Sequence, residues 1–504
     1  MTAPAEPAIR KGIRGGYLNL VVTWVVQLVM VPLLLHRLGS ATYGLYAALT
    51  AVAGYFALLT FGSALTVPRY VADLAARGEA EALNAFVSTY LVAFLAVGVV
   101  GLAIGLAATP LLARWMVVPE ELRAAIAPAW RLVLGGWAIG LAAGLFQSLL
   151  TGLGEVQLAN LANSARTALN LAVAAAVLGA GGRLSDLLVG LIAATLVSSL
   201  ALYVLVRRRH PGITLSFAHA RFGTLRVTLK PTAYYFLMQL AAVVVMGTDN
   251  IVIGVFLGVE RVAAYAVAFQ LWAIMLAVLW SGGDVLLPFF ARWSARSEAE
   301  TLRRAFLKST KYAFAGSVLA AIVLTAYGQR LILWWVGPAL VVDRRVLWVF
   351  AFMLLIATPI HTAALVLAGM GRHRAPAVGG AVEAALNIVL SLLLVRPLGV
   401  LGVALGTAIS GVLTNAWIAP RAAGAELEIG LGEYLRGTLG PALAPGLLAG
   451  AVAMIAGQRA AGGAGVVVAM AAVAVVFVVA FWMVGLDAEE RRAALKLVSA
   501  ESRT

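Results

Sequence analysis

Residues 38–46 read Leu-Gly-Ser-Ala-Thr-Tyr-Gly-Leu-Tyr, and residues 257–265 read Leu-Gly-Val-Glu-Arg-Val-Ala-Ala-Tyr. The initial Leu-Gly and the final Tyr recur at a shift of 219 residues. A long internal repeat of this kind indicates a chain built from two homologous halves. Further matches follow at a shift of 220 residues, where Gly62 and Pro68 recur as Gly282 and Pro288, and Ala85-Phe86 recurs as Ala305-Phe306.

A second matching region places opposite charges at equivalent positions of the two halves. The run Arg166-Thr167-Ala168-Leu169-Asn170 aligns with Glu383-Ala384-Ala385-Leu386-Asn387 at a shift of 217 residues, and each run follows a Gly-x-Gly. Internal repeats are common in secondary transporters, whose substrate path lies between the repeats. We therefore expect Arg166 and Glu383 to confront each other across such a path.

The composition is that of a polytopic membrane protein. Hydrophobic residues make up 62% of the 504 residues, charged residues 12%, and the mean hydropathy is +0.97. A soluble domain of this size needs more charge to cover its surface. The net charge of +15 does not indicate nucleic-acid binding, because basic residues accumulate on the cytoplasmic loops of membrane proteins. The chain has no cysteine, which excludes disulfides and thiolate metal sites.

Apolar runs of about 20 residues predict fourteen membrane-spanning helices in an all-α fold. The first run has no cleavage site after it, so we expect an uncleaved first helix. The distribution of Lys and Arg over the loops places both termini in the cytoplasm. The expected cores are 17–35, 44–62, 85–107, 129–150, 158–179, 186–206, 233–256, 262–283, 312–329, 346–367, 377–395, 399–418, 440–457 and 464–485.

The repeat divides these helices into lobes. We predict an N-lobe of six helices at residues 1–205, a basic cytoplasmic linker at 206–231 and a C-lobe of six helices at 232–420. Residues 421–504 then hold helices 13 and 14, which have no counterpart in the repeat, and a cytoplasmic tail. Because each lobe has an even number of spans, the two lobes have the same orientation, related by an axis along the membrane normal.

The motifs resemble those of a known transporter superfamily. The stretch from Leu38-Gly39 through Tyr43-Gly44-Leu45-Tyr46 to Arg69 is similar to the opening of polysaccharide flippases, and so is Asp249-Asn250-Ile251-Val252-Ile253-Gly254 followed by Tyr265. These flippases belong to the MOP superfamily, with lipid II flippases and MATE multidrug exporters. The resemblance implies a V-shaped pair of lobes and alternating access. It also implies transport of a polyprenyl-pyrophosphate-linked oligosaccharide across a bacterial inner membrane.

Arg166 is the first candidate for substrate binding. A guanidinium matches phosphate oxygens, and charged residues within spans normally face a cavity or a partner. Asn163 and Asn170 flank Arg166 at helical spacing and extend a polar stripe that faces water or a sugar. Arg69 is a candidate for the cytoplasmic mouth of the cavity, as is Asp284. The alternatives are a structural ion pair for Arg166, interhelix hydrogen bonds for the asparagines, and snorkelling side chains for Arg69 and Asp284.

Acidic and amide residues of the second half are candidates for a coupling cation. Glu383 and Asn387 share a helix face, and their oxygens suit a hard cation such as Na⁺; a proton is the other candidate. The resemblance adds Asp249, Asn250 and Thr407 to this set. A salt bridge between Glu383 and Arg166 that latches the lobes is an alternative role for Glu383. For Asp249, the alternative is a position close enough to the membrane interface to be wetted. For His361, we favour a packing role over proton relay.

The chain lacks the sequence features of other functional classes. The chain has no large extramembrane domain and no Asp-x-Asp motif for a glycosyltransferase, and no Gly-x-x-x-x-Gly-Lys-Ser/Thr loop for an ATPase. We therefore expect a transporter with no enzymatic activity and no cofactor beyond Na⁺ or H⁺. The expected partners are the bilayer, an anionic lipid-linked saccharide, and a polymerase or glycosyltransferases. A MATE-type cation-coupled multidrug exporter is the second candidate. The sugar, the coupling ion and the oligomeric state do not follow from the sequence.

Overall fold

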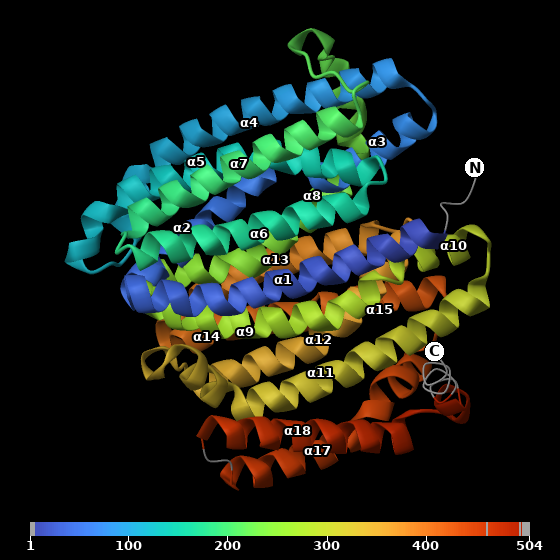
Figure 1. Cartoon of the computed structure of the whole chain (residues 1–504). Helices are drawn as coiled ribbons and strands as arrows, with labels where there is room; N and C mark the ends of the chain where they lie inside the picture. Colours follow the sequence, from blue (N-terminus) through green and yellow to red (C-terminus); the bar gives the residue numbers. More distant parts are fainter. Residues whose placement is uncertain (1–5, 460–461, 493–494, 496–504) are drawn as a thin grey trace. The chain divides into compact units, whose positions relative to one another are not determined.

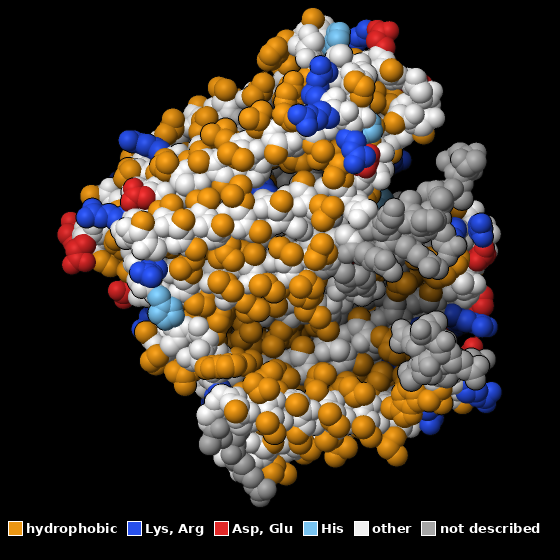
Figure 2. Space-filling view, viewed as in Figure 1, with side chains coloured by type: hydrophobic (Ala, Val, Ile, Leu, Met, Phe, Trp, Pro, Cys, Tyr) orange, Lys and Arg blue, Asp and Glu red, His pale blue; other side chains and the backbone are white. Residues whose placement is uncertain are grey.

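The structure is a computed structural model that describes residues 6–459, 462–492 and 495. Within these residues every regular element is a helix, and fourteen helical segments are long and apolar enough to span a membrane. The expected all-α fold with fourteen spans is confirmed. The part of the predicted tail at residues 493–494 and 496–504 lies outside the described residues. On the face shown in Figure 2, hydrophobic side chains cover the flanks of the helices and charged side chains gather near their ends.

The chain divides into two compact units, residues 1–266 and 267–504 (Figure 1). The first unit holds α1 (Glu6–Leu38), α2 (Ser40–Tyr55), the 3-10 turn η1 (Phe56–Thr60), α3 (Ser63–Ala76), α4 (Ala80–Trp115), α5 (Glu120–Gly152), α6 (Val156–Gly179), α7 (Leu184–Arg209), η2 (Phe217–His219), α8 (Phe222–Phe256) and the start of α9 (Val259–Asp284). The second unit holds the rest of α9, α10 (Leu287–Ala295), α11 (Ala299–Val336), η3 (Pro338–Leu340), α12 (Arg344–Gly369), α13 (Arg374–Leu398), α14 (Val400–Leu413), α15 (Asn415–Glu426), α16 (Leu431–Tyr434), the π turn η4 (Leu435–Leu439), α17 (Gly440–Arg459), α18 (Gly462–Ala480) and the π turn η5 (Phe481–Gly485).

The boundary between the compact units lies about 35 residues after the end of the expected linker. The packing around Gly44 explains this position. A Cβ atom on Gly44 would lie 1.8 Å from the carbonyl oxygen of Val259, so only glycine allows α2 to approach the start of α9 this closely. Helix α8 also packs against α2. These contacts hold α8 and the first turns of α9 within the first unit. The lobe boundary at residues 206–231 remains a prediction about the repeat.

The backbone repeats itself where the sequence does. Gly39 and Gly258 both have left-handed φ angles, 81° and 92°, at the starts of equivalent helices. Gly154 and Gly371 also match, with φ angles of 83° and 72°. A side chain at these positions would be strained, so the glycines preserve the same turns in both halves.

A further match emerges at the turn before α4 and α11. Residues 76–81 read Ala-Arg-Gly-Glu-Ala-Glu and residues 295–300 read Ala-Arg-Ser-Glu-Ala-Glu, at a shift of 219. Gly78 has a φ of 69°, and Ser297 keeps a φ of 57° although it is not glycine. A left-handed serine is uncommon, and this turn keeps the same backbone geometry with glycine in one half and serine in the other.

The helices after the repeat pack within the second unit. Helices α17 and α18 form a hairpin, drawn in red in Figure 1, and α17 packs against α11. The segment after α18 is tied to α11 by an ion pair between Glu490 and Lys311, whose side chains are 2% and 8% exposed. The Lys311 Nζ also donates to the carbonyl of Gly485, at 3.3 Å. Glu490 in turn accepts from the Asp487 N–H, at 2.9 Å, so the charge is held by several bonds.

Candidate functional site

Arg166 lies on α6 and is oriented by a chain of amide side chains. Its Nη2 donates to Asn163 Oδ1 at 2.8 Å, and Asn163 Nδ2 donates to Asn19 Oδ1 on α1 at 2.9 Å. Asn19 Oδ1 also accepts from the Ser164 hydroxyl at 3.1 Å. Because Asn163 uses its NH₂ toward Asn19, its oxygen must face the guanidinium. The structure thus brings Arg166 and Asn163 together and adds Asn19 of α1, which was not among the predicted site residues.

The other two predicted substrate residues differ in their surroundings. Asn170 is half-buried one helical turn beyond Arg166, and its Oδ1 has no hydrogen-bond partner within the described residues. Arg69 lies on α3 with an exposed side chain. Among the described residues, neither side chain bonds to another of the predicted substrate-binding residues. The roles of Asn170 and Arg69 therefore remain predictions.

The helical run of α2, η1 and α3 is broken at the end of the apolar span Ser40–Thr60. Phe61 and Gly62 both have left-handed φ angles, 47° and 72°. Gln239 of α8 bridges the break, because its Oε1 accepts from the Gly62 N–H at 2.8 Å and its Nε2 donates to the Ala57 carbonyl at 2.7 Å. A broken helix inside a membrane leaves backbone groups that need such partners. The matching span of the second half breaks after Asp284, between α9 and α10.

Asp249 lies inside a hydrogen-bonded cluster of the first unit. Its side chain is 2% exposed and accepts from the hydroxyl of Tyr265, which is also buried. The neighbouring Thr248 bonds to Tyr55 of α2. Asn250 is half-buried, and its Oδ1 has no partner within the described residues. Protein atoms cover Asp249 almost completely, which does not fit the alternative that its side chain is wetted at the membrane interface; its role in cation coupling stays a prediction.

Glu383 and Asn387 lie one turn apart on α13 and bond to different helices. Glu383 Oε2 accepts from Asn415 Nδ2 of α15 at 2.8 Å, and Asn387 Nδ2 donates to Thr407 Oγ1 of α14 at 2.7 Å. Small residues allow this close packing, since a Cβ on Gly406 would lie 2.7 Å from the backbone nitrogen of Ser391. Glu383, Asn387 and Thr407 therefore form one polar cluster of the second unit. Asp249 and Asn250 belong to the other unit.

This cluster contains oxygens that lack donors. The Oδ1 atoms of Asn387 and Asn415 are both buried without a hydrogen-bond partner in the described part of the chain. A Cβ on Gly411 would lie 3.3 Å from Glu383 Oε1, so this glycine leaves room beside the carboxylate. One carboxylate and two amide oxygens are ligands that a hard cation accepts. No group of three His, Asp or Glu side chains that would hold a metal ion occurs among the described residues.

A second polar group, missed by sequence reasoning, lies near the break between α9 and α10. His361 Nε2 and Asp284 Oδ1 are 2.9 Å apart, and the His361 ring stacks on Trp280 with centroids 4.3 Å apart. The sequence placed Asp284 at a cavity mouth and His361 in packing, without linking them. No local sequence pattern links the two residues, because they lie 77 positions apart.

The sequence is similar to that of a known protein family and to that of one relative. A family model described as "Polysaccharide biosynthesis protein" matches residues 14–294, more than half of the chain. The chain belongs to this family. The uncharacterized membrane protein EpsK of Bacillus subtilis (strain 168) is 22% identical over 426 residues, which cover 82% of each chain. This member of the polysaccharide biosynthesis protein family is thus a multi-pass membrane protein of the transporter and flippase class.

Solved structures of transporters have the same fold as this chain. The lipid II flippase MurJ in its inward closed conformation superposes with a TM-score of 0.72 at 12% identity, covering 92% of this chain and 96% of that one. An inward-facing MATE multidrug transporter of the MOP superfamily superposes with a TM-score of 0.63 at 16% identity, covering 82% and 94%. The resemblance to the MOP superfamily, stated from the motifs, is confirmed.

Proposed function

We propose that this family member is a flippase that moves an anionic, polyprenyl-pyrophosphate-linked oligosaccharide across the bacterial inner membrane by alternating access. The oriented guanidinium of Arg166 carries this proposal. An ionised side chain in the middle of a span costs about 2.5–3.5 kcal/mol on scales derived from membrane insertion. Such residues are therefore rare in spans and usually have a functional role. Asn163 occupies one side of the guanidinium, and the fork geometry of the remaining N–H groups suits two phosphate oxygens.

The amide groups near Arg166 suit the sugar part of such a substrate. Asn170 presents a buried oxygen without a partner on the same helix. A sugar hydroxyl is both donor and acceptor, so it satisfies an amide oxygen that the protein leaves unpaired. In this proposal Arg166 binds the pyrophosphate, Asn163 and Asn19 hold Arg166 in place, and Asn170 contacts the saccharide.

The substrate class is tested by binding of defined probes to the purified protein. Geranylgeranyl pyrophosphate carries the anionic group, geranylgeraniol has the same chain without it, and tetraphenylphosphonium represents the organic cations of a drug exporter. We expect the pyrophosphate probe to bind best. Arg166→Ala should weaken it roughly 10-fold or more, since a charge-assisted hydrogen bond contributes about 1.5–3 kcal/mol.

Arg123→Ala is the matched control, because Arg123 is an exposed arginine paired only with Glu120, at 3.3 Å. It should leave probe binding unchanged. Equal binding of the pyrophosphate and the alcohol would contradict the proposal. Preferential binding of tetraphenylphosphonium would favour the second candidate, a MATE-type exporter, which the buried carboxylate of Asp249 supports.

The cluster around Glu383 is proposed to hold the coupling cation. Glu383, Asn387 and Asn415 would supply oxygens to Na⁺, and Na⁺ would neutralise the carboxylate within the span. A ligand that binds only the folded protein stabilises it, by about 2.7 kcal/mol at 100 times its Kd. We therefore expect NaCl, compared with choline chloride, to raise the Tm of the purified protein.

Glu383→Gln should abolish this Na⁺-dependent rise, whereas Glu426→Gln at the end of α15 should retain it. The readout does not depend on transport. Equal Tm values in the two salts, with a Tm that instead depends on pH through Glu383, would move the assignment from Na⁺ to a proton.

A further inference from the structure

The segment between α7 and α8 is folded onto the first turns of α4 (Figure 1). Asn84 fixes it twice, because its Nδ2 donates to the carbonyl of Gly212 at 3.0 Å and its Oδ1 accepts from the backbone of the segment. This linker is therefore an ordered structure. Side-chain oxygens of Asn84, Ser88 and Thr89 accept from the backbone N–H groups of Thr214, Ser216 and Arg221 at 2.9, 3.2 and 2.9 Å.

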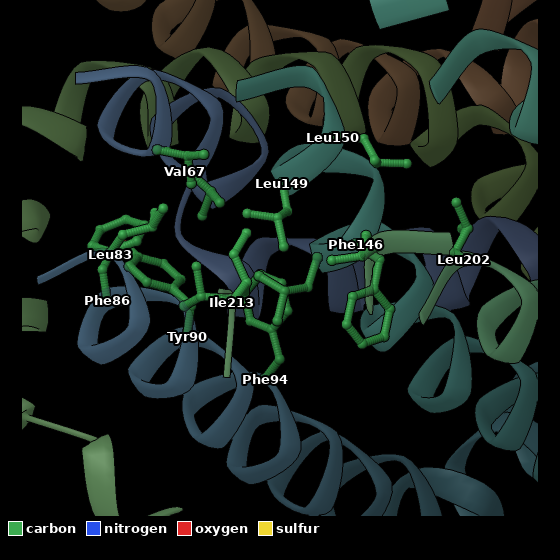
Figure 3. Packing of buried hydrophobic residues seen from close by; sticks show 14 of the residues in the cluster. Val67, Leu83, Phe86, Tyr90, Phe94, Phe146, Leu149, Leu150, Leu202 and Ile213 are labelled. Atoms are coloured by element: carbon green, nitrogen blue, oxygen red, sulfur yellow. The ribbon is translucent and has the colours of Figure 1, made fainter. Parts of the chain in front are cut away.

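The linker buries one hydrophobic residue and exposes two others. Ile213 is 5% exposed and joins the cluster of Phe86 and Tyr90 on α4, as Figure 3 shows. Phe217 and Phe222 are 73% and 69% exposed. Exposure of Phe217 is not a result of fraying, because Ser216 caps its turn by accepting from the Ala218 N–H at 3.3 Å.

The depth of the linker follows from the length of α4. Helix α4 has 36 residues, about 54 Å, whereas the hydrocarbon core of a bilayer is about 30 Å thick. The ends of α4 must therefore extend into the headgroup layers. The linker contacts Asn84, Ser88 and Thr89, all within the first ten residues of α4. It thus lies at the level of the interface, on the side of the helix.

Basic residues precede Phe217 in the sequence and also lie between the two phenylalanines. Arg208, Arg209, His219 and Arg221 are all exposed. Glu155 lies 3.8 Å from Arg209 and Glu81 lies 3.0 Å from Arg221, which leaves an excess of positive charge. In Figure 2, Lys and Arg side chains lie next to hydrophobic ones over this part of the molecule.

We infer that the linker is an anchor to an anionic lipid surface, in which Phe217 and Phe222 insert at the boundary between headgroups and acyl chains while the arginines bind lipid phosphates. Phenylalanine side chains of interfacial segments bury at the boundary between headgroups and acyl chains, and basic residues are attracted to the anionic headgroups beside it. The inference does not depend on the transported substrate.

The absence of cysteine permits a direct test on the full chain. Phe217→Cys, labelled with the environment-sensitive dye NBD, is reconstituted in nanodiscs of phosphatidylcholine with or without phosphatidylglycerol. Glu79→Cys, in the exposed turn before α4, is the control for water, and Val99→Cys, 68% exposed in the middle of α4, is the control for acyl chains. Lipids with a nitroxide near the headgroup or deep in the chain report the depth of each dye.

We expect the dye at 217 to emit at shorter wavelength than at 79, and to be quenched more by the shallow nitroxide than by the deep one. Phosphatidylglycerol should increase this quenching, because each arginine near an anionic surface strengthens attachment roughly fivefold. In the background of Arg208→Gln and Arg221→Gln the effect of phosphatidylglycerol should be lost. Emission and quenching equal to those at 79 would overturn the inference and indicate a surface for a protein partner.

Discussion

At the scale of the residue, Arg166 and Glu383 each bond to an amide side chain: Arg166 donates to Asn163, and Glu383 accepts from Asn415. The sequence predicted that Asn163 and Arg166 share a helix face, and they bond directly. It also grouped Asn387 with Thr407, which form a hydrogen bond. Asn415, the partner of Glu383, was not predicted because it lies 32 residues away and follows a helix break at Thr414 that has no glycine or proline to signal it.

The orientation of Arg166 can be tested at Asn163. Asn163→Asp places a carboxylate against the guanidinium and removes the NH₂ that bonds to Asn19. We expect the variant to fold but to bind geranylgeranyl pyrophosphate roughly 10-fold more weakly, because the new ion pair competes with the phosphate. Thr167→Val is the control, since the Thr167 hydroxyl bonds only to the backbone of its own helix. Unchanged affinity in Asn163→Asp would show that Asn163 does not orient Arg166.

At the scale of the element, helices were predicted better than their interruptions. Hydropathy predicted all fourteen spans, but it did not predict the left-handed residues Phe61 and Gly62 that end the expected core 44–62. Phenylalanine carries no signal for a left-handed conformation. The bridge from Gln239 that stabilises the break is a tertiary contact across 177 residues, which local pattern cannot reveal.

The attachment of the segment after α18 to α11 gives an element-scale prediction. Glu490→Gln or Lys311→Met leaves a buried charge without its partner and should lower the free energy of unfolding by about 3–5 kcal/mol. The double variant Lys311→Met with Glu490→Leu removes both charges and should recover most of the loss. Unfolding of the purified protein in a denaturing detergent series measures all three. Additive losses in the double variant would mean that the two side chains act independently.

At the scale of the whole molecule, duplication was the most predictable property. The matches at Leu38-Gly39 and Leu257-Gly258 correspond to equal backbone turns, and the two helices outside the repeat pack as a separate hairpin. The division of the chain into compact units was less predictable. It depends on the approach of α2 to α9 at Gly44, a contact whose distance cannot be read from either half alone.

The orientation in the membrane is a prediction for the molecule as a whole. Both termini are expected in the cytoplasm, so the loop before α11 should be cytoplasmic and the loop after it external. Ala299→Cys and Ala339→Cys place single exposed cysteines in these two regions of a chain that has none. A membrane-impermeant maleimide added to intact cells should label Ala339→Cys at least 10-fold faster. The opposite ratio would reverse the topology.

The pair formed by Lys311 and Glu490 has a consequence for biosynthesis. The two residues are 179 positions apart. At a synthesis rate of about 5–20 residues per second, Glu490 is therefore added about 10–35 s after Lys311. Until then, α11 holds an ammonium group without its counterion. A copy that ends before residue 490 would keep this unpaired ammonium group on α11, whereas a finished copy pairs it with a carboxylate.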